Sequence, residues 1–468
     1  MKYCCIFFVL AAMAIINFGC TVSGKNYYND SVSGNLSGTE VDLQKFKTPA
    51  GDRTPVILIH GLWGAELRDT AENKSRVWGD FSCFAPTAER KFSAMALLPD
   101  SAEPAASLAA TGILKSTEVD FFGLKFDMAN YSGVIDLLQA AGYVPEKSPL
   151  PENSHYSTLF VYYYDWRKSI DENAAGLADF IEEKKEYLTR QFRSCPKHRN
   201  KDVRFDLLGH SMGGLIARYY VEYGKQKLGS KNDALPQRSW DGAGNVRKLI
   251  MAATPHDGYV DILRELVNGV RFDPLAPGFP AEVLATFQSC YQLLPDVSRQ
   301  TVRFAESGQA VDIFDIRVWK KYQWGLLADT EYNNKLLARM FPNLPSQERY
   351  AAAAEYVSGL LDKAGRFKLL FSRPLGVVPE PLKYYRFAAG GVETNSTLEV
   401  DDKTGAVKVC ATAPGDGKVT LRSAGFEHSR KENPLICSDT YILDGGHLGF
   451  MSSSLFACNL ALVLYSEL

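Results

Sequence analysis

The stretch 207–214 (LLGHSMGG) limits the possible folds of this chain more than any other. It follows 203–206, a short run suited to a buried strand, and leads into 215–223, whose apolar pattern predicts a helix. A strand, a Gly-x-Ser-x-Gly turn and a helix form the pattern that presents a serine hydroxyl above a sheet, with the serine in a strained backbone conformation. The alternative is a Gly-rich phosphate-binding turn, which would require Gly-x-Gly-x-x-Gly or a Lys-[Ser/Thr] pair, and the stretch has neither. We therefore expect Ser211 to be a nucleophile.

The remaining apolar runs predict alternating strands and helices. The expected strands are 55–60, 159–163, 203–206, 246–253 and 384–389. The expected helices are 131–142, 215–223 and a long one that opens at Ser169-x-x-Glu172 and continues to about residue 192. Residues from about 259 to 381 are helical in pattern without an obvious strand. The prediction is an α/β-hydrolase fold, with a mostly parallel central sheet flanked by helices and an inserted helical cap at about 259–381.

The loop after the first strand has the composition of an oxyanion-binding loop. It reads HGLWG at residues 60–64. In this fold one backbone N–H comes from such a loop and another from the residue after the nucleophile. We assign these N–H groups to Leu62 and Met212, and expect His60 to be structural.

The histidine that would activate the serine is selected by chain order. An α/β-hydrolase places its serine first, its acid second and its histidine last. Beyond the elbow, only His256, His428 and His447 follow Ser211. His428 lies in a charged run typical of surface, and His256 precedes the candidate acids. His447 lies in a glycine-rich loop before a helix and is the preferred base.

The acid that would orient this histidine is expected at Asp416. Asp416 lies between two glycines in a loop that follows a strand-like, hairpin-like region. Asp444 is the alternative acid, although a turn residue is its simpler interpretation. Ser211, Asp416 and His447 together satisfy the expected order.

Several motifs taken together resemble the lecithin:cholesterol acyltransferase family, which includes a lysosomal phospholipase with transacylase activity and the phospholipid:diacylglycerol acyltransferases. They are 55–66 (PVILIHGLWGAE), 164–167 (YDWR), 209–220 (GHSMGGLIARYY), 291–295 (YQLLP), 415–423 (GDGKVTLRS) and 447–448 (HL). Two departures are His60, where the family usually has proline, and Cys83, which stands without the second cysteine of the family's lid pair.

The resemblance implies an enzyme that transfers the acyl group of a lipid ester, such as a phospholipid, through an acyl-enzyme to water or an alcohol. It places the catalytic triad on Ser211, Asp416 and His447. Trp63, Asp165 and Trp166 are candidates for substrate contacts. The alternatives are a plain lipase or carboxylesterase and a catalytically silent lipid-binding lipoprotein.

The N-terminus predicts an exported protein. Residues 1–20 combine Lys2, an apolar run and Gly19-Cys20, which is typical of a signal peptide and resembles a bacterial lipoprotein signal with lipid on Cys20. Residues 21–53 are polar and predict a tether, so residues 54–468 would form the hydrolase domain, with a lid at about 64–130. The expected location is membrane-anchored, periplasmic or secreted, with contact to a membrane through the lipid or the lid.

Composition excludes other classes of function. The 468 residues carry a net charge of −2, so no basic surface for nucleic acid is indicated. Nine cysteines are scattered without metal-ligand spacing, so we expect no metal and no cofactor. In an exported protein some could pair, and Cys410 with Cys437 is the first expectation.

Overall fold

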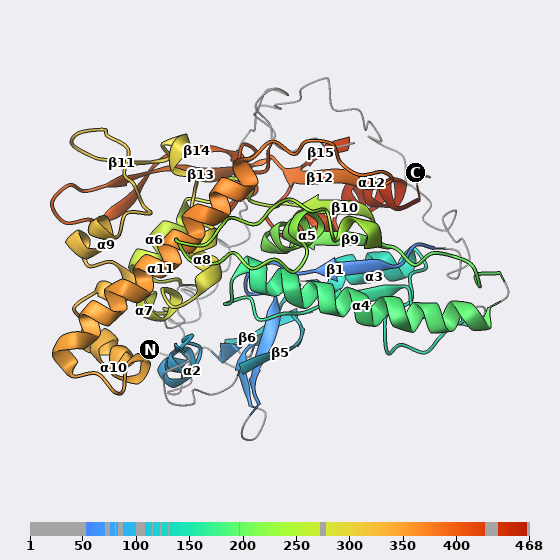
Figure 1. Cartoon of the computed structure of the whole chain (residues 1–468), viewed down its shortest axis with the longest axis horizontal. Helices are drawn as coiled ribbons and strands as arrows, with labels where there is room; N and C mark the ends of the chain where they lie inside the picture. The colour runs from blue at the N-terminus through green and yellow to red at the C-terminus, as the bar shows by residue number, and fades with distance from the viewer. Residues whose placement is uncertain are drawn as a thin grey trace, which may run out of the picture. The chain divides into compact units, whose positions relative to one another are not determined.

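A computed structural model describes residues 53–465, except 71–74, 80, 83–87, 100–107, 115, 122–123, 130, 153, 196, 272–277 and 426–438. Its centre is a six-stranded sheet in which every neighbouring pair is parallel (Figure 1). In spatial order the strands are β15 (Asp439–Leu443), β12 (Lys383–Ala389), β10 (Val246–Ala252), β9 (Phe205–His210), β1 (Val56–Ile59) and β8 (Leu159–Tyr162). The order reverses around β1, and α/β sheets bind ligands at the carboxyl ends of strands next to such a reversal.

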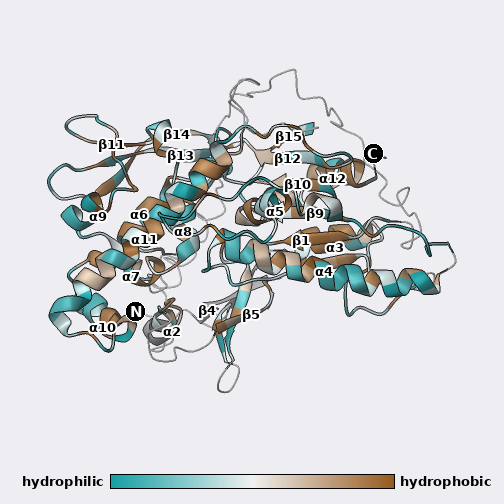
Figure 2. Cartoon of the chain, viewed as in Figure 1, coloured by the Kyte–Doolittle hydropathy of each residue, from teal (hydrophilic) through white to brown (hydrophobic). Residues whose placement is uncertain are grey.

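Apolar residues on both faces of the sheet explain why its strands are continuous hydrophobic runs. In β1, Ile57 and Ile59 belong to the core shared with α4 (Ile170–Ser194) and α5 (Met212–Tyr223). Val56 and Leu58 belong to the core shared with α3 (Ser132–Ala140) and α12 (Ser454–Tyr465). Figure 2 shows β1 in the hydrophobic colour between these helices. This sandwich of helices around a parallel sheet confirms the predicted α/β-hydrolase fold.

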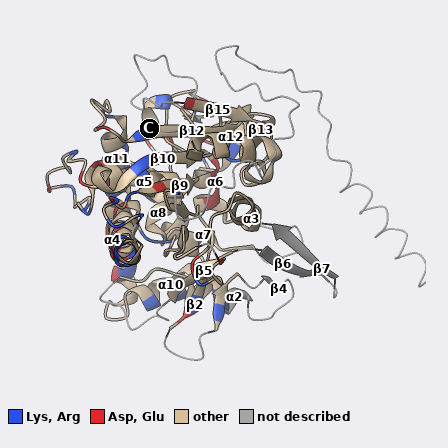
Figure 3. Ribbon diagram, turned by 90° about the vertical axis from the view of Figure 1, so that its right-hand side faces the viewer, with Lys and Arg blue, Asp and Glu red and all other residues tan. Residues whose placement is uncertain are grey.

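Helix α4 begins at the predicted residue but without the predicted capping box. The Ser169 hydroxyl donates to Glu172 Oε1 at 2.8 Å and does not cap the helix, while Gln292 Oε1 accepts from the N–H of Ile170, the first residue of the helix, at 2.6 Å. Asp171 and Glu172 in the first turn instead place negative charge beside the positive end of the helix dipole. Figure 3 shows both acidic and basic residues on α4.

The region expected as a lid contains short strands where aromatic loops were predicted. One small sheet has the order β3 (Arg76–Trp78), β2 (Ala65–Asp69), β5 (Leu108–Ile113), and another β4 (Phe81–Ser82), β6 (Ser116–Phe121), β7 (Leu124–Ala129). A helix, α2 (Ala88–Ala94), lies between β4 and β5 in the chain. The aromatic residues of 77–81 and 121–124 suggest loops from the sequence alone, and this interpretation is wrong at Val77, Trp78, Phe81, Phe121 and Leu124, which lie in strands. Strands this short give little periodicity.

The predicted cap is helical. Its helices are α6 (Asp261–Asn268), α7 (Ala281–Leu284), α8 (Gln288–Gln292), α9 (Ile316–Tyr322), α10 (Glu331–Met340) and α11 (Ser346–Ser372). Its short strand β11 (Val302–Phe304) pairs with β13 and not with the central sheet. Strands β13 (Val392–Val400) and β14 (Val407–Gly415) form the predicted hairpin. Among the described helices, none combines the length and apolar character that crossing a bilayer requires.

Candidate active site

The backbone at Ser211 has the strained conformation expected of an elbow serine. Its φ is 53° and its ψ is −124°, a region that a non-glycine residue rarely adopts. The Ser211 N–H donates to Ala252 O at 2.8 Å, and its carbonyl accepts from Gly214 N at 3.0 Å. These bonds fix the serine between the end of β10 and the start of α5. The residue as a whole is 9% exposed, so the turn that carries the serine is buried.

The glycines of the elbow permit two close backbone approaches. A Cβ at Gly209 would lie 2.6 Å from Gly214 Cα, so the strand and its helix approach each other closely there. A Cβ at Gly213 would overlap the carbonyl groups of Ile59 and His60. Gly213 therefore allows α5 to contact the end of β1, rather than its own strand.

The structure brings Ser211, His447 and Asp416 into one hydrogen-bonded chain. His447 Nε2 is 2.9 Å from Ser211 Oγ, and His447 Nδ1 is 2.8 Å from Asp416 Oδ2. An ionised carboxylate only accepts, so Nδ1 carries the hydrogen and Nε2 is left to accept from the serine hydroxyl. A histidine that removes the proton of the serine must be in this tautomer, with Nε2 free of hydrogen.

Asp416 is held as an anion in spite of its burial. The residue is 3% exposed, and its Oδ1 accepts from the N–H groups of Lys418 at 2.9 Å and Val419 at 2.6 Å. Burial alone would raise the pKa of Asp416, but the charge of His447 and these hydrogen bonds lower it below its ordinary value. One carboxyl oxygen is thus anchored by the backbone while the other binds the histidine.

The loop after β1 lies directly against the nucleophile. A Cβ at Gly61 would be 2.8 Å from Ser211 Cβ, so Leu62 follows a residue in contact with the serine. Among the hydrogen bonds of the described residues, none uses the N–H of Leu62 or Met212 as donor. Met212 is the first residue of α5, where a helix N–H has no intrahelical acceptor. The two N–H groups assigned from the sequence are therefore available to an oxyanion.

His60 is part of the scaffold of this loop. It is fully buried, its Nδ1 donates to Gly61 O at 2.7 Å, and its Nε2 accepts from Tyr164 N at 3.2 Å. The Tyr164 hydroxyl donates to His60 O at 2.6 Å, and the two rings stack 4.1 Å apart. Burial lowers the pKa of His60 to about 4, so the ring is neutral and structural at neutral pH.

Neither Asp444, the alternative acid, nor His256 takes part in the hydrogen-bonded chain of Ser211, His447 and Asp416. His256 lies in the loop after β10, and neither of its buried ring nitrogens has a hydrogen-bond partner. The carboxyl of Asp444 faces Gly391, and no bond to His447 is recorded for it among the described residues. His428 lies outside the described residues.

Trp63, Asp165 and Trp166 already have partners within the protein. Trp166 is fully buried and donates its indole N–H to Ala65 O at 3.0 Å. Both carboxyl oxygens of Asp165 bind Arg167, at 2.9 and 2.7 Å. Trp63, with a φ of 65°, has its ring centroid 4.4 Å from that of Trp166. Their roles as substrate contacts remain predictions.

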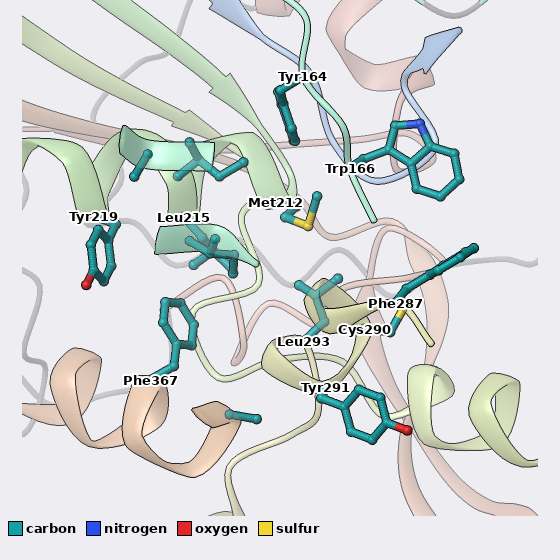
Figure 4. Close-up of a cluster of buried hydrophobic side chains, with 14 of the residues drawn as sticks. Tyr164, Trp166, Met212, Leu215, Tyr219, Phe287, Cys290, Tyr291, Leu293 and Phe367 are labelled. Carbon is teal, nitrogen blue, oxygen red and sulfur yellow. The ribbon is translucent and has the colours of Figure 1, made fainter. Parts of the chain in front are cut away.

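An aromatic cluster connects the loop after β1 with the cap. The Trp63 ring lies 5.2 Å from Phe279 and 6.0 Å from Phe287, both in the cap. Trp166, Phe287 and Met212 belong to one buried core, drawn in Figure 4. Three other cap aromatics, Trp319, Tyr322 and Trp324, are buried against one another.

The cysteines of the described residues are free thiols. Cys410 is exposed and unpaired, so the expected disulfide with Cys437 is not formed at Cys410. Cys437, Cys83 and the proposed lipidation site Cys20 lie outside the described residues. Within the described part of the chain, no group of three or more His, Cys, Asp or Glu is placed to hold a metal ion.

Two residues beside the nucleophile escaped the sequence analysis. Tyr131 was expected only as the start of a helix, and His210 only as part of the elbow motif. In the structure the Tyr131 hydroxyl lies 2.8 Å from His210 Nδ1 and 2.7 Å from the N of Gly61. A tyrosine 80 residues before the serine carries no local signal of this contact, so sequence pattern alone could not find it.

Comparison with known proteins identifies one family. The family model described as lecithin:cholesterol acyltransferase matches residues 74–361, more than half of the chain. The matched part includes Ser211 and ends before Asp416 and His447. No curated protein matches the sequence.

Solved structures give distant likenesses. A structure of the Tle4–Tli4 complex is 13% identical, covers 89% of this chain and 99% of the other, and has a TM-score of 0.49. Lipase 1 from Pelosinus fermentans is 12% identical, with 89% and 99% covered and a TM-score of 0.35. The mature lipase BlEst2 from Bacillus licheniformis is 12% identical, with 89% and 94% covered and a TM-score of 0.32. The fold assignment rests on the parallel sheet and its helices, not on these likenesses.

Proposed function

Because the chain belongs to the lecithin:cholesterol acyltransferase family, we propose that it is a serine-dependent acyltransferase and acyl hydrolase of lipid esters. The acyl group passes from a lipid ester, of which a phospholipid is the expected kind, to Ser211. It then passes to water or to an alcohol. No cofactor or metal takes part in this scheme.

One observation carries this proposal: the continuous chain of contacts from Ser211 Oγ through His447 to Asp416, at 2.9 and 2.8 Å. A nucleophile and base within hydrogen-bonding distance, with the base oriented by a third group, is the arrangement that activates a serine. The strained φ of 53° at Ser211 supports the same role.

The mechanism follows from these contacts. His447 Nε2 takes the Ser211 proton as Oγ attacks the ester carbonyl, and the N–H groups of Leu62 and Met212 bind the oxyanion. His447 then protonates the departing alcohol, which leaves an acyl-enzyme. Water or an acceptor alcohol gives its proton to His447 and attacks the acyl-enzyme. His447 then returns this proton to Ser211 Oγ as the acyl–oxygen bond breaks, which releases the acid or the new ester and restores the serine hydroxyl. Asp416 stabilises the imidazolium at both stages.

A fluorophosphonate probe tests the nucleophile. We expect the wild-type protein to be labelled covalently on Ser211, because only an activated serine reacts, and Ser211→Ala to be unlabelled. The matched control is Ser194→Ala at the exposed end of α4, which should label like wild type. An unlabelled, folded wild-type protein would contradict the proposal and favour a catalytically silent lipid-binding protein.

Location and membrane contact are part of the proposal. We place a signal peptide at 1–20, lipid on Cys20 and a tether at 21–53, all outside the described residues except Arg53. The segment 64–130 is proposed as the lid and 259–381 as the cap. The tether would let the catalytic domain reach lipid in the membrane to which Cys20 is anchored.

A further inference from the structure

The hydroxyl of Tyr131 lies between two loops of the candidate active site. Tyr131 immediately precedes α3 and is 3% exposed. Its oxygen accepts from Gly61 N at 2.7 Å, and its O–H is 2.8 Å from His210 Nδ1. Gly61 precedes Leu62, and His210 precedes Ser211. One phenol therefore binds both the oxyanion loop and the nucleophile elbow.

His210 extends this chain to the histidine loop. Its Nε2 is 2.9 Å from the backbone carbonyl of His447. A carbonyl only accepts, so Nε2 carries the hydrogen and Nδ1 accepts from the Tyr131 hydroxyl. The phenol oxygen is then left to accept from Gly61 N–H. Each donor in this hydrogen-bonded chain has one acceptor, so the hydrogen atoms can be placed in only one way.

The surroundings hold this arrangement in one protonation state. Burial, followed by the charge of His447, lowers the pKa of His210 to about 3, so the ring is neutral at neutral pH. Helix α3 also packs against the 3-10 helix η6 (Gly449–Ser452), which follows the His447 loop. Val134 of α3 and Phe450 of η6 share a buried core.

We infer that Tyr131 is a positioning residue: acting with His210, it sets the oxyanion loop, the serine and the base relative to one another. This inference rests on the proposed function. It goes beyond it because Tyr131 touches neither the substrate nor the reacting atoms. Rates depend steeply on such geometry, since a misplacement of about 1 Å can cost on the order of 100-fold.

Tyr131→Phe is the direct test, because it removes the hydroxyl and keeps the buried ring. With a chromogenic ester, kcat should fall about 10-fold to 100-fold while KM stays within about twofold. The rate of fluorophosphonate labelling should fall in parallel. The matched control is Tyr219→Phe in α5, whose hydroxyl donates to Gln226 O at 2.9 Å, and its kcat should be unchanged.

A double-mutant cycle distinguishes two residues that act through one hydrogen-bonded chain from two residues whose substitutions disturb the structure independently. Tyr131→Phe with His210→Leu should lose no more kcat than the more damaging single variant, because the two residues act through one chain. Independent, multiplying losses would overturn the inference. So would a Tyr131→Phe enzyme with wild-type kcat.

The tautomer of His210 gives a readout independent of turnover. In protein labelled with ¹⁵N-histidine, we expect His210 as the Nε2–H form, and its signals should move in Tyr131→Phe. An Nδ1–H form would overturn the inference while the wild-type enzyme remains active. A wild-type protein without turnover or labelling would instead overturn the proposed function, and the positioning role with it.

Discussion

The two oxygens of the Asp416 carboxyl have different partners, and a substitution can separate their effects. Oδ2 binds His447 and Oδ1 binds the backbone at Lys418 and Val419. In Asp416→Asn an amide occupies the site, and His447 is held in the wrong tautomer. We expect kcat to fall about 10³-fold to 10⁴-fold, less than in Ser211→Ala, as measured by ester hydrolysis.

Asp444→Asn is the matched control for the acid. Asp444 lies three residues before His447 in the same loop region, and we expect its variant to retain activity within about threefold, since surface turn residues contribute little to rate. If Asp444→Asn were the more damaging of the two substitutions, the acid would be assigned to the wrong residue.

Buried neutral histidines predict a stability that depends on pH. Burial lowers the pKa of His60 to about 4 and, together with the charge of His447, that of His210 to about 3. The unfolded chain takes up protons near pH 6.5 while these folded residues do not, so stability is present above pH 6.5 and is lost as pH falls. By pH 5 the loss in unfolding free energy should be about 2 kcal/mol for each histidine.

Urea denaturation at pH 7 and pH 5 measures this effect. His60→Gln removes one titrating group, so its unfolding free energy should change less between the two pH values than that of wild type. A wild-type midpoint that is constant or higher at pH 5 would contradict the assignment of these rings as neutral in the folded state.

Three of the residues that lie together at the candidate site could be selected from the sequence for a physical reason. Ser211, Asp416 and His447 were selectable because the fold imposes an order on the three residue types along the chain. His60 was expected to be structural, and both its ring nitrogens bind backbone. Tyr131 could not be selected, because its role depends on a contact across 79 positions with His210.

At the scale of elements, close backbone approach explains the glycines of the elbow. Gly209→Ala would place Cβ 2.6 Å from Gly214 Cα, and backbone on both sides leaves no side chain to move away. We expect a loss of about 1–3 kcal/mol in unfolding free energy. Denaturant unfolding followed by circular dichroism measures it.

Gly365→Ala in α11 is the matched glycine control. Nothing lies within 4 Å of its added Cβ, and the residue is in a helix interior. Alanine loses less conformational freedom than glycine there, so we expect a gain of about 0.5–1 kcal/mol. If Gly209→Ala and Gly365→Ala changed the unfolding free energy equally, close backbone approach would not explain the glycine at position 209.

Long segments that are buried on both faces were easier to predict from the sequence than short ones. The strands of the central sheet are buried on both faces and produce continuous apolar runs, as in residues 246–252. Strand β3 has three residues and pairs with β2, and a run this short shows no periodicity in the sequence. The Ser169 capping box failed because its hydroxyl binds the Glu172 side chain.

At the scale of the whole molecule, the proposed acyl-enzyme has two competing acceptors, water and an alcohol. An alcohol competes with water only where a site binds it and excludes water. Phe279 and Phe287 of the cap contact Trp63 beside the oxyanion loop and could form such a wall. Trp319, Tyr322 and Trp324 pack against one another in the interior of the cap.

Product partitioning tests acyl transfer. With a phospholipid or aryl ester donor and an added long-chain alcohol or sterol, we expect new ester to increase with acceptor while donor turnover is constant or higher. Phe287→Ala should shift products toward free acid, because it opens the apolar wall to water. Free fatty acid as the only product with every acceptor would identify a lipase or esterase.

The central claim is that Ser211 carries the acyl group between donor and acceptor. The most direct measurement is mass spectrometry of protein quenched during turnover of an ester. We predict a mass increase equal to one acyl group, located on the peptide that contains Ser211 and absent in Ser211→Ala. Turnover with no acyl group on that peptide, or with the group on another residue, would contradict the account.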